Sequence, residues 1–545
     1  MQEFAASEYQ ATGTPAFRPR NDSHQGIHGP GALSTQTSTR QADATHTSKW
    51  LDITQGPPAS DKCPVEVLSR IFELVVVAEE STWFPQPRAL TWTAPLILLR
   101  ICSRWRRIAM NTPRLWTRIN ALMLSDTLTD TFLRWSKSAP IDIAFPQYGK
   151  RDRFMTLVAQ HVHRWRSLEL KNLNLDAEEA IKLLQVPTPH LQSFHITLKG
   201  HAQLLEDLFA GVAPQLHTLK LSGLCLSLAS PLFANLRVLN LTSMGRHILL
   251  ISQLLSIIER SPLLEELVLH HRYFLLDHAT ETASPPNPSP IKLSHLGCLY
   301  LEMDIPAAQC IISRIITPPR SNLQLILHGP VPNHLNEIFP NSAASTHSLQ
   351  NIPHAHDFRV VAQENLGGCS MRGNGPKGFF HIDFLGPSEP GFFNHILVNP
   401  GRALPMPALE ELFLYIDDSV SVSTLTSFLA DYPSVRMLAL DGCREVLLEA
   451  LLDRQQCPRL ERLKIYAHQI TDALLIRLVQ SRSGPEMGSE VQDLGSGTPL
   501  QHVYLPECRG LSRATVLALQ GYPCEVHLTE GDSSDDMSDR ERAYN

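Results

Sequence analysis

The stretch Pro262-Leu263-Leu264-Glu265-Glu266-Leu267-Val268-Leu269 decides the fold of this chain, because the pattern Pro-x-Leu-x-x-Leu-x-Leu recurs along it. Similar octapeptides occupy residues 214–221, 407–414, 433–440 and 458–465, and a shortened copy occupies 235–241. The closing Leu-x-Leu alternates with a period of two, which predicts a short strand with one buried face. One copy is too small to bury that face alone, so the recurrence predicts a stacked array.

Helices are expected between these strands, at residues 151–164, 246–260, 423–430, 445–454 and 471–480. Strand and helix alternating at about 20–32 residues is the leucine-rich-repeat pattern. The predicted fold is therefore α/β, an irregular leucine-rich-repeat solenoid at 123–530 with parallel strands on its concave face and helices on its convex face. Residues 328–402 break the period, and we interpret them as an irregular insertion or a degenerate pair of repeats.

Composition narrows the class of protein. The chain has 545 residues, of which 43% are hydrophobic, and a net charge of -7 without a dense Lys/Arg run, which argues against nucleic-acid binding. No apolar run approaches the roughly 18 residues of a membrane span, and the N-terminus lacks a signal core. The ten cysteines are scattered, which is typical of a reducing compartment. We expect an intracellular protein, cytoplasmic or nuclear, that does not bind membranes.

The two ends of the chain have a different composition. Residues 1–60 are rich in Gly, Ser, Thr, Gln and Pro, and residues 531–545 are acidic and serine-rich. Such segments bury too little apolar surface to offset the entropy of ordering, so we expect both to be disordered.

A separate helical segment precedes the repeats, at residues 61–122. Pro64 can start a helix whose apolar positions form one stripe: Val67, Leu68, Ile71, Phe72 and Val75. A second helix, which Thr112-Pro113 ends, carries another stripe: Leu98, Ile101, Cys102, Trp105 and Ile108. A domain of about 60 residues buries little surface alone, so these helices are expected to dock on something else.

This segment resembles the F-box in the three blocks 63–72, 99–109 and 112–116. It is especially similar to the form in mushroom-forming fungi, in which a loop such as 78–93 separates the first two blocks and leucine-rich repeats follow. One departure is Cys63, where the family usually has Leu before the proline.

The resemblance implies a substrate receptor that is not itself an enzyme. F-box domains bind the Skp-type adaptor of a cullin-RING ubiquitin ligase, and the downstream domain captures an unknown protein substrate. The positions that match the adaptor-facing part of the motif are Pro64, Val67, Leu68, Ile71, Phe72 and Trp105. An alternative is a scaffold outside any ligase, whose F-box-like helices only cap the solenoid. Some of these side chains are expected to serve the internal core in either case.

The array also predicts a place for the substrate. Because the leucines of Leu-x-Leu point inward, the residues between and beside them lie on the concave face. Exposed aromatics on such a face are the preferred anchors of protein interfaces. The predicted substrate-binding residues are Tyr300, Phe413, Tyr415, Tyr466 and Tyr504. The alternative is that the insertion 328–402 or a terminal extension covers this face.

No catalytic, cofactor-binding or metal-binding residue is predicted. The match to Gly-x-Gly-x-x-Gly at 373–378 is followed by a strand-like run, which favours a hairpin or loop over a nucleotide site. The close histidine pairs, 161/163, 270/271 and 354/356, lack the further ligands that a zinc site needs.

Overall fold

The structure is a computed structural model that describes residues 62–78, 94–122, 124–145, 152–173, 184–200, 202–205, 207–276, 289–330, 335–339, 348–363, 368–386, 392–398, 400–415, 420–466, 470–483, 498–506 and 512–529. The chain divides into two units, Met1–Pro64 and Val65–Asn545. Both predicted disordered ends, 1–60 and 531–545, lie outside the described residues. The elements below all belong to the second unit.

The described part of this unit opens with the helices α2 (Val65–Ala78), α3 (Ala94–Ile101) and α4 (Ser103–Met110). A 3-10 turn follows at Pro113–Trp116. The prediction of one helix through residues 98–108 is wrong, because Cys102 has extended backbone angles and separates α3 from α4. The Cys102 thiol accepts a hydrogen bond from the Trp105 backbone N–H and so caps the start of α4.

Within the described residues, seventeen strands form one sheet. Their pairings give the order β1 (Arg118–Asn120), β2 (Ile141–Phe145), β3 (Trp165–Leu173), β4 (Ser193–Leu198), β6 (Thr218–Ser222), β8 (Val238–Thr242), β10 (Glu266–His270), β13 (Cys298–Asp304), β15 (Asn322–His328), β18 (Gly378–Leu385), β17 (Gly368–Gly375), β16 (Asp357–Gln363), β19 (Glu411–Tyr415), β20 (Met437–Asp441), β21 (Arg462–Tyr466), β22 (His502–Pro506) and β23 (Glu525–Thr529). Every neighbouring pair is parallel except the two that involve β17. The predicted mixed α/β class with a mostly parallel sheet is confirmed.

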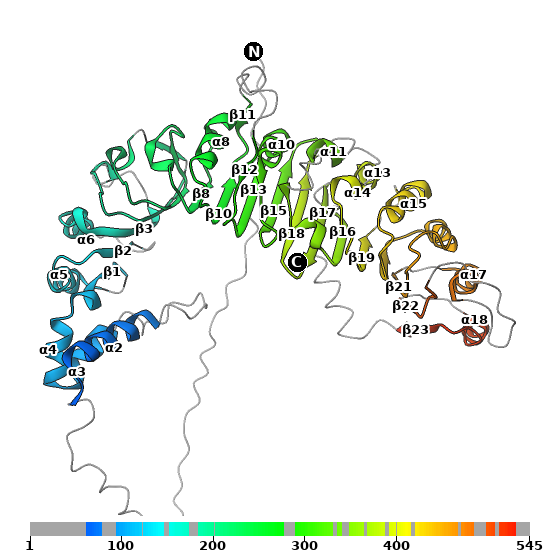
Figure 1. Cartoon of the computed structure of the whole chain (residues 1–545), viewed down its shortest axis with the longest axis horizontal. Helices are drawn as coiled ribbons and strands as arrows, with labels where there is room; N and C mark the ends of the chain where they lie inside the picture. Colours follow the sequence, from blue (N-terminus) through cyan, green and yellow to red (C-terminus); the bar gives the residue numbers. More distant parts are fainter. Residues whose placement is uncertain are drawn as a thin grey trace, which may run out of the picture. The chain divides into compact units, whose positions relative to one another are not determined.

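Helices lie on one side of this sheet, as Figure 1 shows for α8, α10, α15 and α17. The helices after β1 are α5 (Asp126–Trp135), α6 (Asp152–Ala159), α8 (Ile251–Glu259), α10 (Ile305–Arg314), α11 (Leu335–Ile338), α13 (Phe392–Leu397), α14 (Pro400–Ala403), α15 (Val422–Ala430), α16 (Glu445–Leu448), α17 (Asp472–Ser483) and α18 (Arg513–Leu519). The five predicted helices correspond to α6, α8, α15, α16 and α17, and α8 begins five residues later than expected, because residues 249–250 pair as a strand.

Short elements fill the remaining connections. Three two-stranded sheets pair β5 (Gln203–Leu205) with β7 (Leu224–Leu226), β9 (Leu249–Leu250) with β11 (Phe274–Leu275), and β12 (Ile291–Lys292) with β14 (Ile315–Ile316). Further 3-10 turns occupy Val162–Arg164, Leu208–Gly211, Pro231–Phe233, Ile352–His354 and Glu449–Leu452.

The core consists of leucine rows that run across the strands. The first leucine of each Leu-x-Leu is in register with the same leucine of the next strand: Leu219, Leu239, Leu267, Leu299 and Leu323. All five are at most 1% exposed. Burying one such side chain stabilises the fold by about 1.5–3 kcal/mol, but only when the neighbouring copy covers it. Stacking is therefore what makes the short strands stable.

Serine hydroxyl groups join neighbouring copies at two places in the sheet. The Ser321 hydroxyl donates to the Leu296 carbonyl at 2.7 Å, and the Ser434 hydroxyl donates to the Leu409 carbonyl at 2.7 Å. Both bonds span 25 residues and satisfy groups at the turn that precedes each strand. The turns thus stack in register with the strands.

The irregular segment 328–402 continues the sheet. Strand β16 pairs with β19, and the chain then folds back through antiparallel β17 to β18, which pairs with β15. The order of strands is therefore locally reversed, which is why the period fades in the sequence. The predicted hairpin at 373–378 is confirmed as the turn between β17 and β18. Glycine is required at Gly375, because a Cβ there would collide with the His354 carbonyl oxygen.

Candidate functional site

Helix α2 has two apolar stripes that face different surroundings. Leu68, Phe72 and Val76 are buried and recur every four residues, so they form one side of the helix. A neighbouring stripe, which we call the α2 stripe, is 42–50% exposed and comprises Val67, Ile71, Leu74 and Val75. Helix α3, which packs on α2, adds Ile97 and Ile101, each about half exposed. Contiguous exposed apolar side chains of this kind are typical of a surface that binds a partner.

The six positions predicted to face an adaptor divide between surface and interior. Pro64, Val67 and Ile71 are exposed. Leu68 and Phe72 are buried, and the Phe72 ring lies 4.8 Å from the half-buried Trp105 ring. The Phe72–Trp105 contact joins α2 to α4, and Leu68 is buried beside it on α2, so these side chains belong to the helical core in this structure.

The face of the sheet opposite the leucine rows carries a polar row of side chains. At the position between the two leucines, consecutive strands align Glu169, His195, Lys220, Asn240, Val268, Tyr300 and Gln324, and later Arg359, Phe413, Ala439, Lys464, Tyr504 and His527. Alternation predicted these positions for this face, apart from Glu169, Gln324, Arg359 and His527, which only the strand pairing adds. We call them the outer row.

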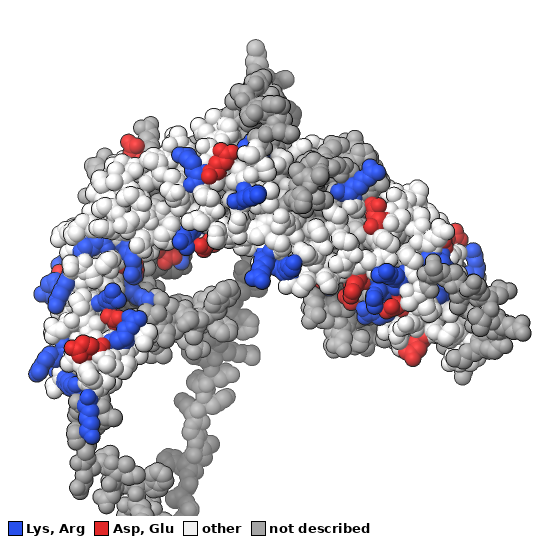
Figure 2. Space-filling model, in the orientation of Figure 1, with Lys and Arg blue, Asp and Glu red and all other residues white. Residues whose placement is uncertain are grey.

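Many charges near the outer row are already paired within the sheet. The Lys220 ammonium lies 3.0 Å from the Glu266 carboxylate, and the Arg462 guanidinium lies 3.1 Å from that of Glu411. The hydrogen bond from His195 is the largest of the effects that lower the pKa of Glu169 to about 2. In Figure 2 both signs of charge are interspersed over the strands, whereas Lys and Arg predominate at the end that carries α2–α4. This face therefore presents charges of both signs, many of which already have a partner within the sheet.

The five predicted aromatic anchors all lie on this face, but in different surroundings. Tyr415 and Tyr504 are half-buried, whereas the hydroxyl of Tyr300 donates to Glu302 at 2.7 Å. Burial and this hydrogen bond raise the pKa of Tyr300. The expectation of an exposed ring is wrong for Tyr466, which is 4% exposed. Its ring lies 6.4 Å from that of Phe413, and the Lys464 ammonium covers it at 4.8 Å.

A hollow of about 270 Å³ opens beside these rings, and we call it the Phe413 hollow. It spans β16, β19, β20 and β21, where the small Ala439 lies between Phe413 and Lys464 in the outer row. Its lining combines aromatic and charged groups: Asp357, Arg359, Glu411, Phe413, Lys464 and Tyr466. Aromatic walls with a few charges around them are suited to binding a side chain of another protein.

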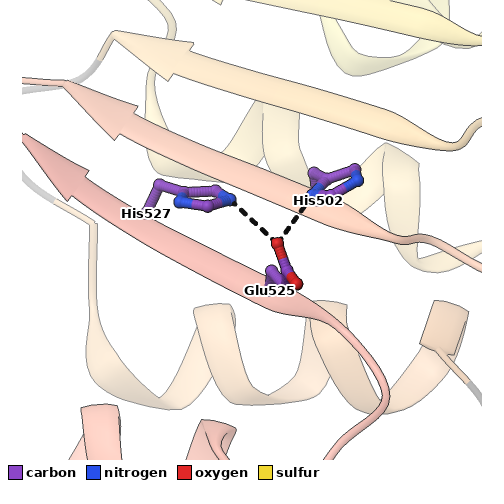
Figure 3. Close-up of side chains that lie close together, drawn as sticks. All are labelled: His502, Glu525 and His527. Carbon is purple, nitrogen blue, oxygen red and sulfur yellow. Dashed lines mark ion pairs between the residues drawn. The ribbon is translucent and has the colours of Figure 1, made fainter.

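A third group of side chains lies at the last two strands. Figure 3 shows His502, Glu525 and His527 converging from β22 and β23. The Glu525 carboxylate lies 3.4 Å from Nδ1 of His502 and 3.5 Å from Nε2 of His527. The sequence analysis missed this group. Alternation places Glu525 and His527 on one face of β23, but the octapeptides that define the repeat end at residue 465, so they do not align His502 with Glu525.

Among the helices that the structure describes, none has both the length and the apolar character needed to cross a membrane. A scan against protein-family models finds no match, and neither does a search of the curated proteins.

Proposed function

We propose that this chain is the substrate receptor of a Skp-cullin-F-box type ubiquitin ligase. In this proposal α2–α4 act as an F-box that binds the Skp-type adaptor, and the sheet is a leucine-rich-repeat solenoid that binds the target protein. The chain carries out no chemistry itself. It raises the effective concentration of a target lysine near the ubiquitin-charged enzyme, and this assembly operates in the cytoplasm or nucleus.

The α2 stripe is the observation that carries this proposal. Four apolar side chains on one helix, together with Ile97 and Ile101 on the next, remain exposed beside a stripe that is already buried. Covering each with a partner is worth on the order of 1 kcal/mol or more, given half-exposed side chains of this size. An F-box resemblance in the sequence and an unpaired apolar stripe in the structure therefore point to the same surface.

The Phe413 hollow supports the second half of the proposal. It lies on the sheet face that the alternation predicts for a substrate, and it joins Phe413 to charged groups of both signs. A protein segment that inserts an apolar or aromatic side chain there would bury apolar surface against Phe413. Its polar groups would be oriented by the charges of Arg359 and Glu411.

The alternative function is a scaffold outside any ligase, in which α2–α4 only cap the sheet. The buried stripe of Leu68, Phe72 and Val76 favours it, since these residues would be apolar in a simple cap as well. The exposed α2 stripe argues against it, because a cap gains nothing from apolar residues on its outward side.

The test is binding of the full chain to a purified Skp-type adaptor, measured by calorimetry. A Val67→Glu, Ile71→Glu double variant places two carboxylates on the α2 stripe and leaves the buried stripe intact. Because burying an unpaired charge costs several kcal/mol, we expect at least about 100-fold weaker binding.

The matched control is Val446→Glu on α16, where the replaced side chain is 58% exposed. This variant is expected to bind like the wild type. Circular dichroism establishes that all three proteins are folded. A folded wild type that does not bind the adaptor, or a double variant that binds as the wild type does, would overturn the proposal.

A further inference from the structure

We propose that His502, Glu525 and His527 form a binding site for a divalent transition metal ion of the Zn²⁺ class. The site is distinct from the α2 stripe and from the Phe413 hollow, so it does not depend on adaptor binding. It belongs to β22 and β23, the last two strands of the sheet that the structure describes.

The ligand atoms are those that zinc prefers, and they converge. Nδ1 of His502, Nε2 of His527 and a carboxylate oxygen of Glu525 all lie within 4.8 Å of one another. Zinc bonds of about 2.0–2.1 Å at tetrahedral angles separate neighbouring ligand atoms by about 3.3–3.4 Å. The two observed nitrogen-to-carboxylate distances, 3.4 and 3.5 Å, correspond to that separation.

The same distances are longer than a normal hydrogen bond. An N–H···O bond spans about 2.7–3.2 Å, and neither nitrogen has a hydrogen-bond partner although both atoms are buried from solvent. A buried polar atom without a partner is costly, and so each such atom calls for an explanation. A cation between the three side chains would satisfy both nitrogens at once.

The surrounding strands hold the ligands in place. Parallel pairing puts His502 opposite Glu525, and Tyr504 opposite His527. The rings of Tyr504 and His527 are stacked with centroids 4.7 Å apart and an interplanar angle of 12°, which fixes the plane of that imidazole. Glu525 is 71% exposed, so a cation can enter from the carboxylate side.

A second histidine-carboxylate group on the same sheet lacks this convergence. Glu302 lies between His270 at 2.9 Å and His328 at 3.5 Å, on β10, β13 and β15. Within the described residues the metal-compatible spacing is met by the His502 group alone. The two groups therefore have the same residue types and lie on the same face of the sheet. They differ in whether the three ligand atoms converge.

Three protein ligands leave one position of a tetrahedral site for water or for a side chain of a bound protein. Two imidazoles and one carboxylate favour Zn²⁺ and other divalent first-row transition metals over Mg²⁺ or Ca²⁺, which prefer oxygen ligands. A bound ion would join β22 to β23 and so stabilise β23, which pairs with one neighbour only among the strands that the structure describes.

The experiment is calorimetric titration of the chelator-treated full chain with Zn²⁺. The chain contains 24 histidines, so the wild type is compared with His527→Ala, Glu525→Gln and the matched control His270→Ala. We expect one strong site in the wild type and in His270→Ala. Because even loss of a residue that supports a metal ligand typically costs 10–100-fold, losing a ligand itself is expected to weaken binding at least about 100-fold.

Hydrogen exchange of residues 502–529 gives a second readout, and slower exchange on adding Zn²⁺ is expected only where the site is intact. If His527→Ala proves unfolded by circular dichroism, Glu525→Gln alone decides the question, because it keeps the shape of the side chain. No strong site in the wild type, or equal weakening by His270→Ala and His527→Ala, would mean adventitious histidine binding only and would overturn the inference.

Discussion

Replacing Phe72 with alanine is expected to open α2 locally while the sheet stays folded. The ring is 1% exposed and lies 4.8 Å from that of Trp105, so its removal leaves a cavity between α2 and α4. Truncating a buried phenylalanine typically costs about 3–5 kcal/mol. Since every 1.4 kcal/mol is a factor of ten, local opening of α2 becomes roughly 100-fold to a few thousand-fold more frequent.

Hydrogen exchange read by mass spectrometry suits this prediction, because a long repeat-like array does not unfold in one two-state step. Peptides that cover α2 report the opening directly, and peptides that cover β10–β15 serve as an internal reference. The control is the neighbouring Ile71→Ala. That side chain is 44% exposed and alanine favours a helix, so exchange is expected to change by less than about fivefold.

The two variants also separate folding from docking. Ile71→Ala is expected to weaken adaptor binding while exchange in α2 stays within that fivefold range, whereas Phe72→Ala changes both binding and exchange strongly. Similar exchange in both variants would refute the division of α2 into a buried and an exposed stripe, and so would a Phe72→Ala protein with the protection of the wild type.

Two further predictions concern the sheet. Arg482 is buried, and its guanidinium donates to backbone carbonyls in the turn 451–457. Arg482→Met is therefore expected to destabilise residues 445–466 by about 3 kcal/mol, which would be measured as roughly 100-fold faster hydrogen exchange. The control is Arg477→Met on the same helix, where the replaced side chain is exposed and the exchange rate should change by less than about threefold. The pKa of Glu169 is lowered from 4.5 to about 2, mainly by its hydrogen bond with His195, so its carboxylate stabilises the fold above about pH 4.5 and loses this effect as the pH falls toward 2. The difference in Tm between the wild type and Glu169→Gln should therefore be constant above pH 4.5 and should decrease as the pH falls below it. A difference that increases in acid would contradict the lowered pKa of Glu169.

Periodicity in the sequence was sufficient for the strands that close a copy of the octapeptide, namely β6, β8, β10, β19, β20 and β21, because burial of Leu-x-Leu depends only on alternation and on a neighbouring copy. It was insufficient for the order of strands at 328–402. The reversed order arises because β18 pairs with β15 and β16 pairs with β19. Each strand would show the same apolar alternation whichever of these neighbours it paired with, so the sequence pattern does not predict the order.

The helix boundaries show a similar limit. The apolar stripe through Leu98, Ile101 and Trp105 continues across the break at Cys102, so hydrophobic spacing alone predicted one helix. What ends α3 is the extended backbone of Cys102, whose thiol then caps the start of α4, and neither feature leaves a trace in the periodicity.

The candidate sites differ in how far they could be predicted. Alternation placed all five aromatic anchors on the correct face, but it could not predict that Tyr466 is buried. That burial arises because Ala439 is small enough for Phe413 to reach across β20. Contacts between strands that are not neighbours in the sequence are beyond any local pattern.

The central claim is that this chain connects a target protein to a ubiquitin ligase, and it is tested most directly by reconstitution with purified adaptor and cullin. The full chain, the adaptor and the cullin are mixed, and the mass of the complex is measured by size-exclusion chromatography with light scattering. The account predicts a ternary complex that requires the adaptor and is lost in the Val67→Glu, Ile71→Glu variant. A folded chain that elutes alone in the presence of both partners would contradict it.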